Sequence, residues 1–123
     1  RSAEFYLTAA EAALELNDMD NARHYLTELM KKRYLSAIYP TYEAEILSMT
    51  QDELREEIYN ERFRELAFEG HRWFDLRRTT RQELTKTYKG ETYVLQKDDS
   101  RYTLRIPADA IEANPGLEEE NRE

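Results

Sequence analysis

Two glutamates on the apolar face of one predicted helix constrain the fold of this 123-residue chain more than any other feature. Successive helical residues are rotated by about 100°, so a helix from Gln51 to about Glu69 places a mixed set of residues on one face. That face consists of Leu54, Ile58, Glu61, Glu65 and Phe68. If it is buried, each carboxylate needs a cation beside it, because an unpaired buried charge is strongly destabilising.

Arginines close by in the sequence can supply these cations. The planar guanidinium group can bind a carboxylate through two hydrogen bonds, which suits a buried pair. We therefore predict an ion-pair network that fixes a short helix over His71–Arg78 against the longer helix. Its predicted members are Glu61, Arg62, Glu65, Glu69, Arg72, Asp75 and Arg77. If Glu65 is fully buried there, Glu65→Gln should destabilise the fold by several kcal/mol.

The same two carboxylates permit a second interpretation, as an acid/base pair of the kind that glycosidases use. Helix neighbours four residues apart lie on the order of 6 Å apart at Cβ, a spacing compatible with carboxylate chemistry. Carboxylates flanked by arginines on one helix are more often structural, however, and no other catalytic constellation accompanies Glu61 and Glu65. The network is therefore the favoured interpretation, and we expect no enzymatic activity.

The periodicity of apolar residues predicts a mainly α-helical fold built from tetratricopeptide-like helical hairpins. Residues 1–33 are predicted to form one such hairpin, with Ala10, Ala22 and Leu26 facing inward. A loop over residues 34–50 would follow, and then a motif-bearing helix pair over 51–79. Thr50 and Glu53 form a capping-box pattern at the start of that pair.

The predicted structure changes character after residue 79. Apolar residues alternate before and after Asp98-Asp99-Ser100, which predicts a small β-hairpin with its turn at these residues. Pro107 ends the alternation. The rest of the segment 80–123 is predicted to be an irregular tail with short helical pieces.

Composition excludes several classes of function. The net charge is −8 and no basic stripe is present, so we expect no nucleic-acid partner. The absence of cysteine excludes disulfides and thiolate metal sites. His24 and His71 stand apart from other metal-ligating residues, so we expect neither a metal nor another cofactor. A helical pattern begins at Ser2 with no targeting segment before it. We therefore interpret this chain as a piece of a longer protein.

The motif that spans the two predicted helices, residues 61–78, has a distinctive order of residues. It contains Glu61-Arg62, Glu65-Leu66, Phe68-Glu69-Gly70, Arg72-Trp73-Phe74-Asp75-Leu76 and the basic pair Arg77-Arg78. Downstream come Ile106-Pro107, Ile111, Asn114-Pro115-Gly116-Leu117 and Asn121. Together these resemble the C-terminal portion of the SusD/RagB family, over nearly the whole chain. Glu120 replaces the usual glutamine, and Arg122-Glu123 replaces a Gly-Tyr-type ending.

The resemblance implies a function for a parent protein. Such a protein would lie on the outer membrane, facing outward and held by a lipid anchor outside this chain. It would bind glycans such as starch, or another nutrient, and pass them to a SusC-like TonB-dependent transporter during polysaccharide uptake. This chain would be mainly scaffold, with the missing N-terminal part of the fold as its partner. Without that part, the exposed helix faces would favour self-association.

Two further interpretations stay open beside this one. A tetratricopeptide-like module that binds another protein is the alternative function. Within a glycan-binding protein, Tyr39 and Tyr42 are candidate ligand-binding residues, because aromatic rings in a loop can stack on sugars. Trp73 could also stack on a sugar, but its place within the motif favours packing in the core.

Overall fold

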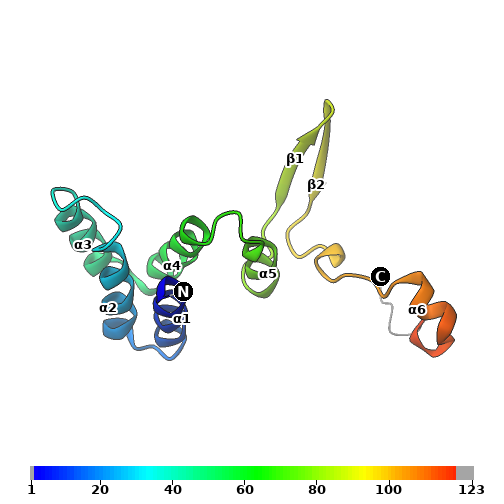
Figure 1. Ribbon diagram of the computed structural model, residues 1–123, viewed down its shortest axis with the longest axis horizontal. Helices are drawn as coiled ribbons and strands as arrows, with labels where there is room; N and C mark the ends of the chain where they lie inside the picture. The colour runs from blue at the N-terminus through cyan, green and yellow to red at the C-terminus, as the bar shows by residue number, and fades with distance from the viewer. Residues whose placement is uncertain (1, 119–123) are drawn as a thin grey trace. The chain divides into compact units, whose positions relative to one another are not determined.

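The computed structural model describes residues 2–118 and divides into two compact units, residues 1–72 and 73–123 (Figure 1). Most of the described chain is helical, and its two strands form one antiparallel sheet. The predicted fold class, mainly α with a small β-hairpin, is therefore confirmed.

Four helices of the described residues lie wholly within the first unit. They are α1 (Ser2–Glu15), α2 (Met19–Met30), α3 (Tyr39–Ser48) and α4 (Gln51–Glu65). The Asp18 side chain caps α2 by accepting a hydrogen bond from the backbone N–H of Asn21. At α4, the predicted capping box between Thr50 and Glu53 is confirmed.

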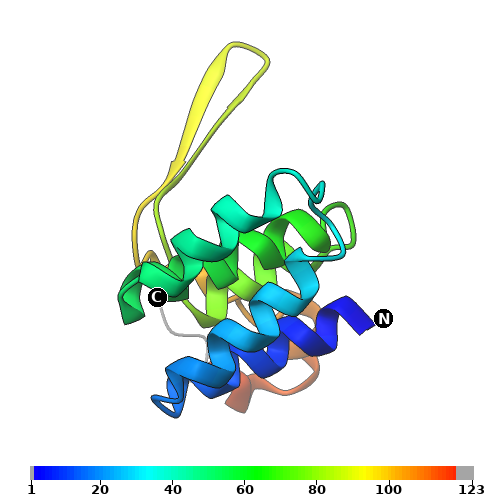
Figure 2. The ribbon, with the colours of Figure 1, turned by 90° about the vertical axis from the view of Figure 1, so that its left-hand side faces the viewer.

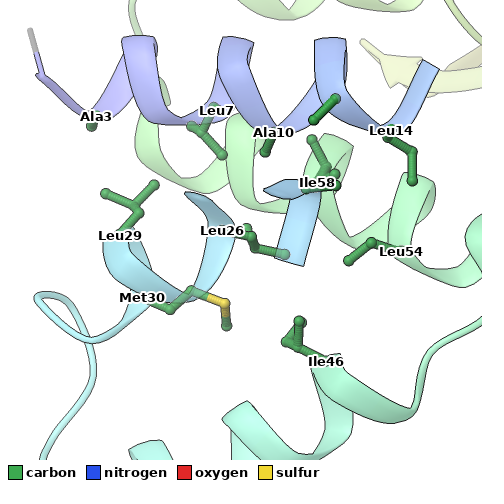
Figure 3. Close-up of a cluster of buried hydrophobic side chains, with 12 residues drawn as sticks. Ala3, Leu7, Ala10, Leu14, Leu26, Leu29, Met30, Ile46, Leu54 and Ile58 are labelled. Atoms are coloured by element: carbon green, nitrogen blue, oxygen red, sulfur yellow. The ribbon is translucent and has the colours of Figure 1, made fainter. Parts of the chain in front are cut away.

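One cluster of buried apolar side chains holds these four helices together (Figure 3). Ala10 and Ala22 are fully buried, and their small size lets α1 and α2 approach closely. Leu26 of α2 lies among the side chains of α1 and α4, and Ile46 brings α3 into the same cluster. A fully buried leucine of this kind stabilises a fold by about 1.5–3 kcal/mol.

The prediction of a loop over residues 34–50 was wrong, because α3 occupies most of that segment and packs against α2 (Figure 2). On the sequence alone, Tyr39-Pro40 is compatible with a turn. Proline in the first turn of a helix instead favours its start, since its fixed φ is helical and its missing N–H would have no partner there. Burial of Ile46 then holds the helix in place.

Helix α4 ends earlier than predicted, at Glu65 instead of about Glu69. Phe68 and Gly70 adopt positive φ angles of 64° and 80°, so the chain leaves the helical path there. Phe68 consequently does not belong to the buried face of α4, and its side chain is fully exposed. Leu54, Ile58 and Glu61 do form that buried face.

The second unit combines short elements. Helix α5 (His71–Arg78) begins at the end of the first unit and continues into the second. It is followed by β1 (Leu84–Tyr88), β2 (Glu91–Leu95) and the 3₁₀ turn η1 (Ser100–Tyr102). The predicted short helical pieces near the end are α6 (Ala108–Ala113) and η2 (Pro115–Leu117). Asn121 and the rest of the tail after residue 118 lie outside the described residues.

The β-hairpin turns at Lys89-Gly90 and not at Asp98-Asp99-Ser100, so its predicted position was wrong. A two-residue hairpin turn of the favoured type needs positive φ at both central residues. Lys89 and Gly90 provide φ angles of 50° and 83°. Asp99 instead accepts a hydrogen bond from the backbone N–H of Arg101 and caps η1, which places Tyr102 in the core of this unit.

Candidate functional site

Glu65, at the end of α4, pairs with Arg33 just beyond the end of α2. The Arg33 Nε donates to Glu65 Oε2 at 2.8 Å, and Nη2 donates to Oε1 at 2.6 Å. This two-pronged geometry is the strong form of the arginine–carboxylate pair. The hydrogen bond from Arg33 lowers the pKa of the Glu65 carboxyl. Arg33 was not a member of the predicted network, although it anchors one of its two central carboxylates.

Glu61 is the more deeply buried carboxylate, with 4% of its side chain exposed. Its partner is Arg64 on the next turn of the same helix, whose Nε donates to Glu61 Oε2 at 2.8 Å. Arg64 also pairs with Glu57, one turn earlier. A half-exposed arginine therefore neutralises the carboxylate that faces the core, as burial of a charge requires.

Other motif residues make contacts that extend beyond the predicted set. Arg62 lies 3.8 Å from the Glu4 carboxylate of α1, which links α1 to α4. The guanidinium of Arg72 lies over the ring of Phe63 at 4.5 Å from the centroid. Further contacts within the motif and just after it are Glu69–His71, Asp75–Arg78 and the bond from Arg81 Nε to the Arg77 carbonyl.

These contacts identify residues that the sequence analysis missed, chiefly Arg33 and Arg64. Arg64 could have been found, because it lies three residues after Glu61 on the same helix. Arg33 carries no such signal, since 32 residues separate it from Glu65. Each of the two glutamates proposed as an acid/base pair is thus held by an arginine, an arrangement that suits a structural role.

We expect Glu65→Gln to lower the free energy of unfolding by about 1 kcal/mol at neutral pH. The effect is smaller than that of a fully buried pair because 45% of the Arg33 side chain is exposed. The folded pKa of Glu65 is lowered, so its stabilisation is complete above about pH 5 and disappears as the pH falls through that lowered value. Urea unfolding of both proteins at neutral and acidic pH measures the difference. A difference that persists unchanged in acid would contradict an ionic origin.

Tyr39 and Tyr42 lie in α3, not in a loop. The Tyr39 hydroxyl donates to the Glu43 carboxylate at 2.8 Å. Burial, followed by this hydrogen bond, raises the pKa of Tyr39 to about 12. The ring of Tyr42 packs against that of Tyr34, with centroids 4.4 Å apart. Both candidate rings are therefore half-buried and packed against the core cluster of the first unit.

Trp73 packs inside the second unit, as its position in the motif had favoured. Its ring stacks on that of Tyr102 at a centroid distance of 5.1 Å and an angle of 10°. Tyr102 is fully buried, and its hydroxyl donates to the carbonyl of Gln82. The pair joins α5 to η1 around the base of the hairpin.

The same unit contains a pocket of about 240 Å³, lined by Ser100, Arg101, Thr103, Leu104 and Arg105. Ligand sites usually enclose roughly 300–1,000 Å³, so this pocket is small for one. Arg101 is also engaged, through bonds to Asp99 and to the carbonyl of Val94. We therefore assign no ligand to it.

Residues 2–118 contain neither a cluster of metal-ligating side chains nor a membrane-spanning helix. That part of the chain brings together no group of three or more histidine, aspartate or glutamate residues able to hold a metal ion. None of its helices is long and apolar enough to cross a membrane.

Comparison with known proteins shows similarity to a protein family and to one of its curated members. The sequence pattern of the SusD family matches residues 1–122. A curated relative, the SusD-like protein P25 of Formosa agariphila, is 40% identical over 76 residues. This alignment covers 62% of the chain but only 14% of the relative.

Proposed function

Since this chain belongs to the SusD family, we propose that its protein binds glycans or a related nutrient during polysaccharide utilisation and catalyses no reaction. The family match along residues 1–122 is the observation that carries the proposal. The ion pairs of Glu61 with Arg64 and of Glu65 with Arg33 support the non-catalytic part, because both carboxylates already have cationic partners.

Within that protein, we propose that this chain is the C-terminal portion and acts mainly as a scaffold. The hairpin of α1 and α2 and the capped helix α4 share one packed cluster of buried apolar side chains, which supports this role. The missing N-terminal part would be its partner and would carry the lipid anchor at the outer-membrane surface. A SusC-like TonB-dependent transporter would receive the bound glycan.

Glycan-array or calorimetric binding by this chain, beside a longer protein that contains it, tests the proposal. We expect the longer protein to bind at least one glycan class. Binding by both would place a sugar site within these residues, and Tyr39 and Tyr42 remain candidates for it. Binding by the longer protein alone would support the scaffold role. If neither bound any glycan, the proposed function would be wrong.

A protein-interaction module remains the alternative, and one observation favours it. Phe5 of α1 and Leu16, the residue just after α1, are 75% and 80% exposed on the side opposite the core. Ala9 and Ala12 lie between them on that face, so a second helix could approach closely. Sedimentation of the chain over a range of concentrations would show whether this face also drives self-association.

A further inference from the structure

The β-hairpin of the second unit presents two chemically different faces. Eight of its ten residues, Thr85–Tyr88 and Glu91–Val94, are exposed. Residues directly opposite each other share a face, and side chains alternate between faces along a strand. The pairing Lys86↔Tyr93 and Tyr88↔Glu91 therefore puts these four side chains on one face. The opposite face carries Thr85, Thr87, Thr92 and Val94.

The first of these faces, which we call the tyrosine face (Lys86, Tyr88, Glu91 and Tyr93), exposes two aromatic rings. Tyr88 and Tyr93 are 63% and 54% exposed. The Tyr93 hydroxyl donates to Glu91 Oε2 at 2.6 Å, which restrains the ring and occupies the carboxylate. Half-exposed rings beside polar groups are suited to the C–H faces of sugar rings, because they combine apolar area with hydrogen-bonding partners.

The tyrosine face carries one cation, Lys86, and one carboxylate, Glu91, and Lys89 in the turn adds a second cation. Lys86 lies across from Tyr93, and the Lys89 ammonium in the turn lies 5.3 Å from the centroid of the Tyr88 ring. Neither lysine forms a salt bridge with any residue in the described range 2–118. Because the Glu91 carboxylate accepts the Tyr93 hydroxyl, the two lysines beside the aromatic rings form a small cationic site for an anion in a chain whose net charge is −8.

We propose that the tyrosine face, together with Lys89, binds an anionic glycan, one whose sugars bear carboxylate or sulfate groups. Tyr93 and Tyr88 would contact the sugar rings, and Lys86 and Lys89 would pair with the anionic groups. This inference rests on the proposed function and names the ligand class and the residues for it. The half-buried Tyr39 and Tyr42 of α3 instead contact an acidic and an aromatic side chain, Glu43 and Tyr34.

Affinity electrophoresis of the full chain in three gels tests the proposal. The gels contain polygalacturonate for carboxylate groups, carrageenan for sulfate groups, and dextran as a neutral polymer. We expect retardation in at least one anionic gel and none in dextran.

Tyr93→Ala should weaken binding about tenfold. Lys86→Gln, which leaves both rings in place, should weaken binding and reduce its dependence on salt. Thr92→Ala, next to Tyr93 but on the opposite face, is the matched control and should bind like the wild type.

The outcomes separate this inference from the proposed function. If the wild type binds and both Tyr93→Ala and Lys86→Gln bind equally well, the glycan site lies elsewhere and only this inference is wrong. Equal retardation in dextran would exclude the selectivity for anions. If only the longer protein binds, the same variants of the longer protein test whether the tyrosine face is its glycan site. If neither protein binds any glycan, both proposals are wrong.

Discussion

Leu26→Ala should lower the free energy of unfolding of the first unit by about 2–5 kcal/mol. Leu26 is fully buried in the cluster that joins α1, α2, α3 and α4 (Figure 3). Truncation removes apolar contacts and leaves a cavity that rigid helices fill only in part. Domains of this size are stable by about 5–15 kcal/mol, so the loss is a large share of the total. Urea unfolding followed by far-ultraviolet circular dichroism measures it.

Leu35→Ala is the matched control, because it makes the same chemical change at a side chain that is 72% exposed. We expect its effect to stay within about 0.5 kcal/mol. Equal losses for the two variants would mean that Leu26 is not a core residue and that α2 packs differently. Leu26 belongs to α2 and Leu35 to the connection between α2 and α3, so the comparison tests whether the α2 side chain is the one buried in the core.

The helices around this core were largely predictable from local signals. Apolar spacing identified α1 and α2, and Thr50 with Glu53 marked the start of α4. Helix α3 was missed because Tyr39-Pro40 is compatible both with a turn and with the first turn of a helix. Burial of Ile46 favours the helix, and burial depends on contacts with α2 that a local pattern does not reveal.

The hairpin shows a similar limit. Alternating residues flank both Lys89-Gly90 and Asp98-Asp99, so periodicity alone does not choose between the two turns. The choice depends on backbone conformation, because Gly90 at φ 83° completes a tight two-residue turn. Asp99 accepts hydrogen bonds from Arg101 and supports a 3₁₀ turn instead.

The two ion pairs also differ in whether residues nearby in the sequence are enough to predict them. The bond between Glu61 and Arg64 follows from helical spacing, whereas the bond between Glu65 and Arg33 requires the three-dimensional arrangement of α2 and α4. A network restricted to nearby arginines was therefore too local. The tyrosine face was missed for the same reason as the hairpin, since its composition depends on strand register.

The second unit should lose its structure in Tyr102→Ala. Tyr102 is fully buried, stacks on Trp73 and is bonded to the Gln82 carbonyl, in a unit where Leu76 is the other buried apolar residue among those described. Removing a buried aromatic side chain costs about 3–5 kcal/mol, more than so small a core can compensate. Trp73 is the single tryptophan of the chain, so its fluorescence reports on this unit. We expect its emission to shift to longer wavelength.

Two comparisons make this result specific. Tyr102→Phe keeps the ring stack and removes only the hydroxyl, so it should cost about 1 kcal/mol and leave the emission of Trp73 nearly unchanged. In Tyr102→Ala the helical signal of α1 to α4 should persist, because their core cluster contains no residue of the second unit. A cooperative loss of both signals would instead show that the two units fold as one. Loss of Trp73 packing alone would also abolish binding by the tyrosine face, since β1 and β2 are joined to α5 and η1 through this core.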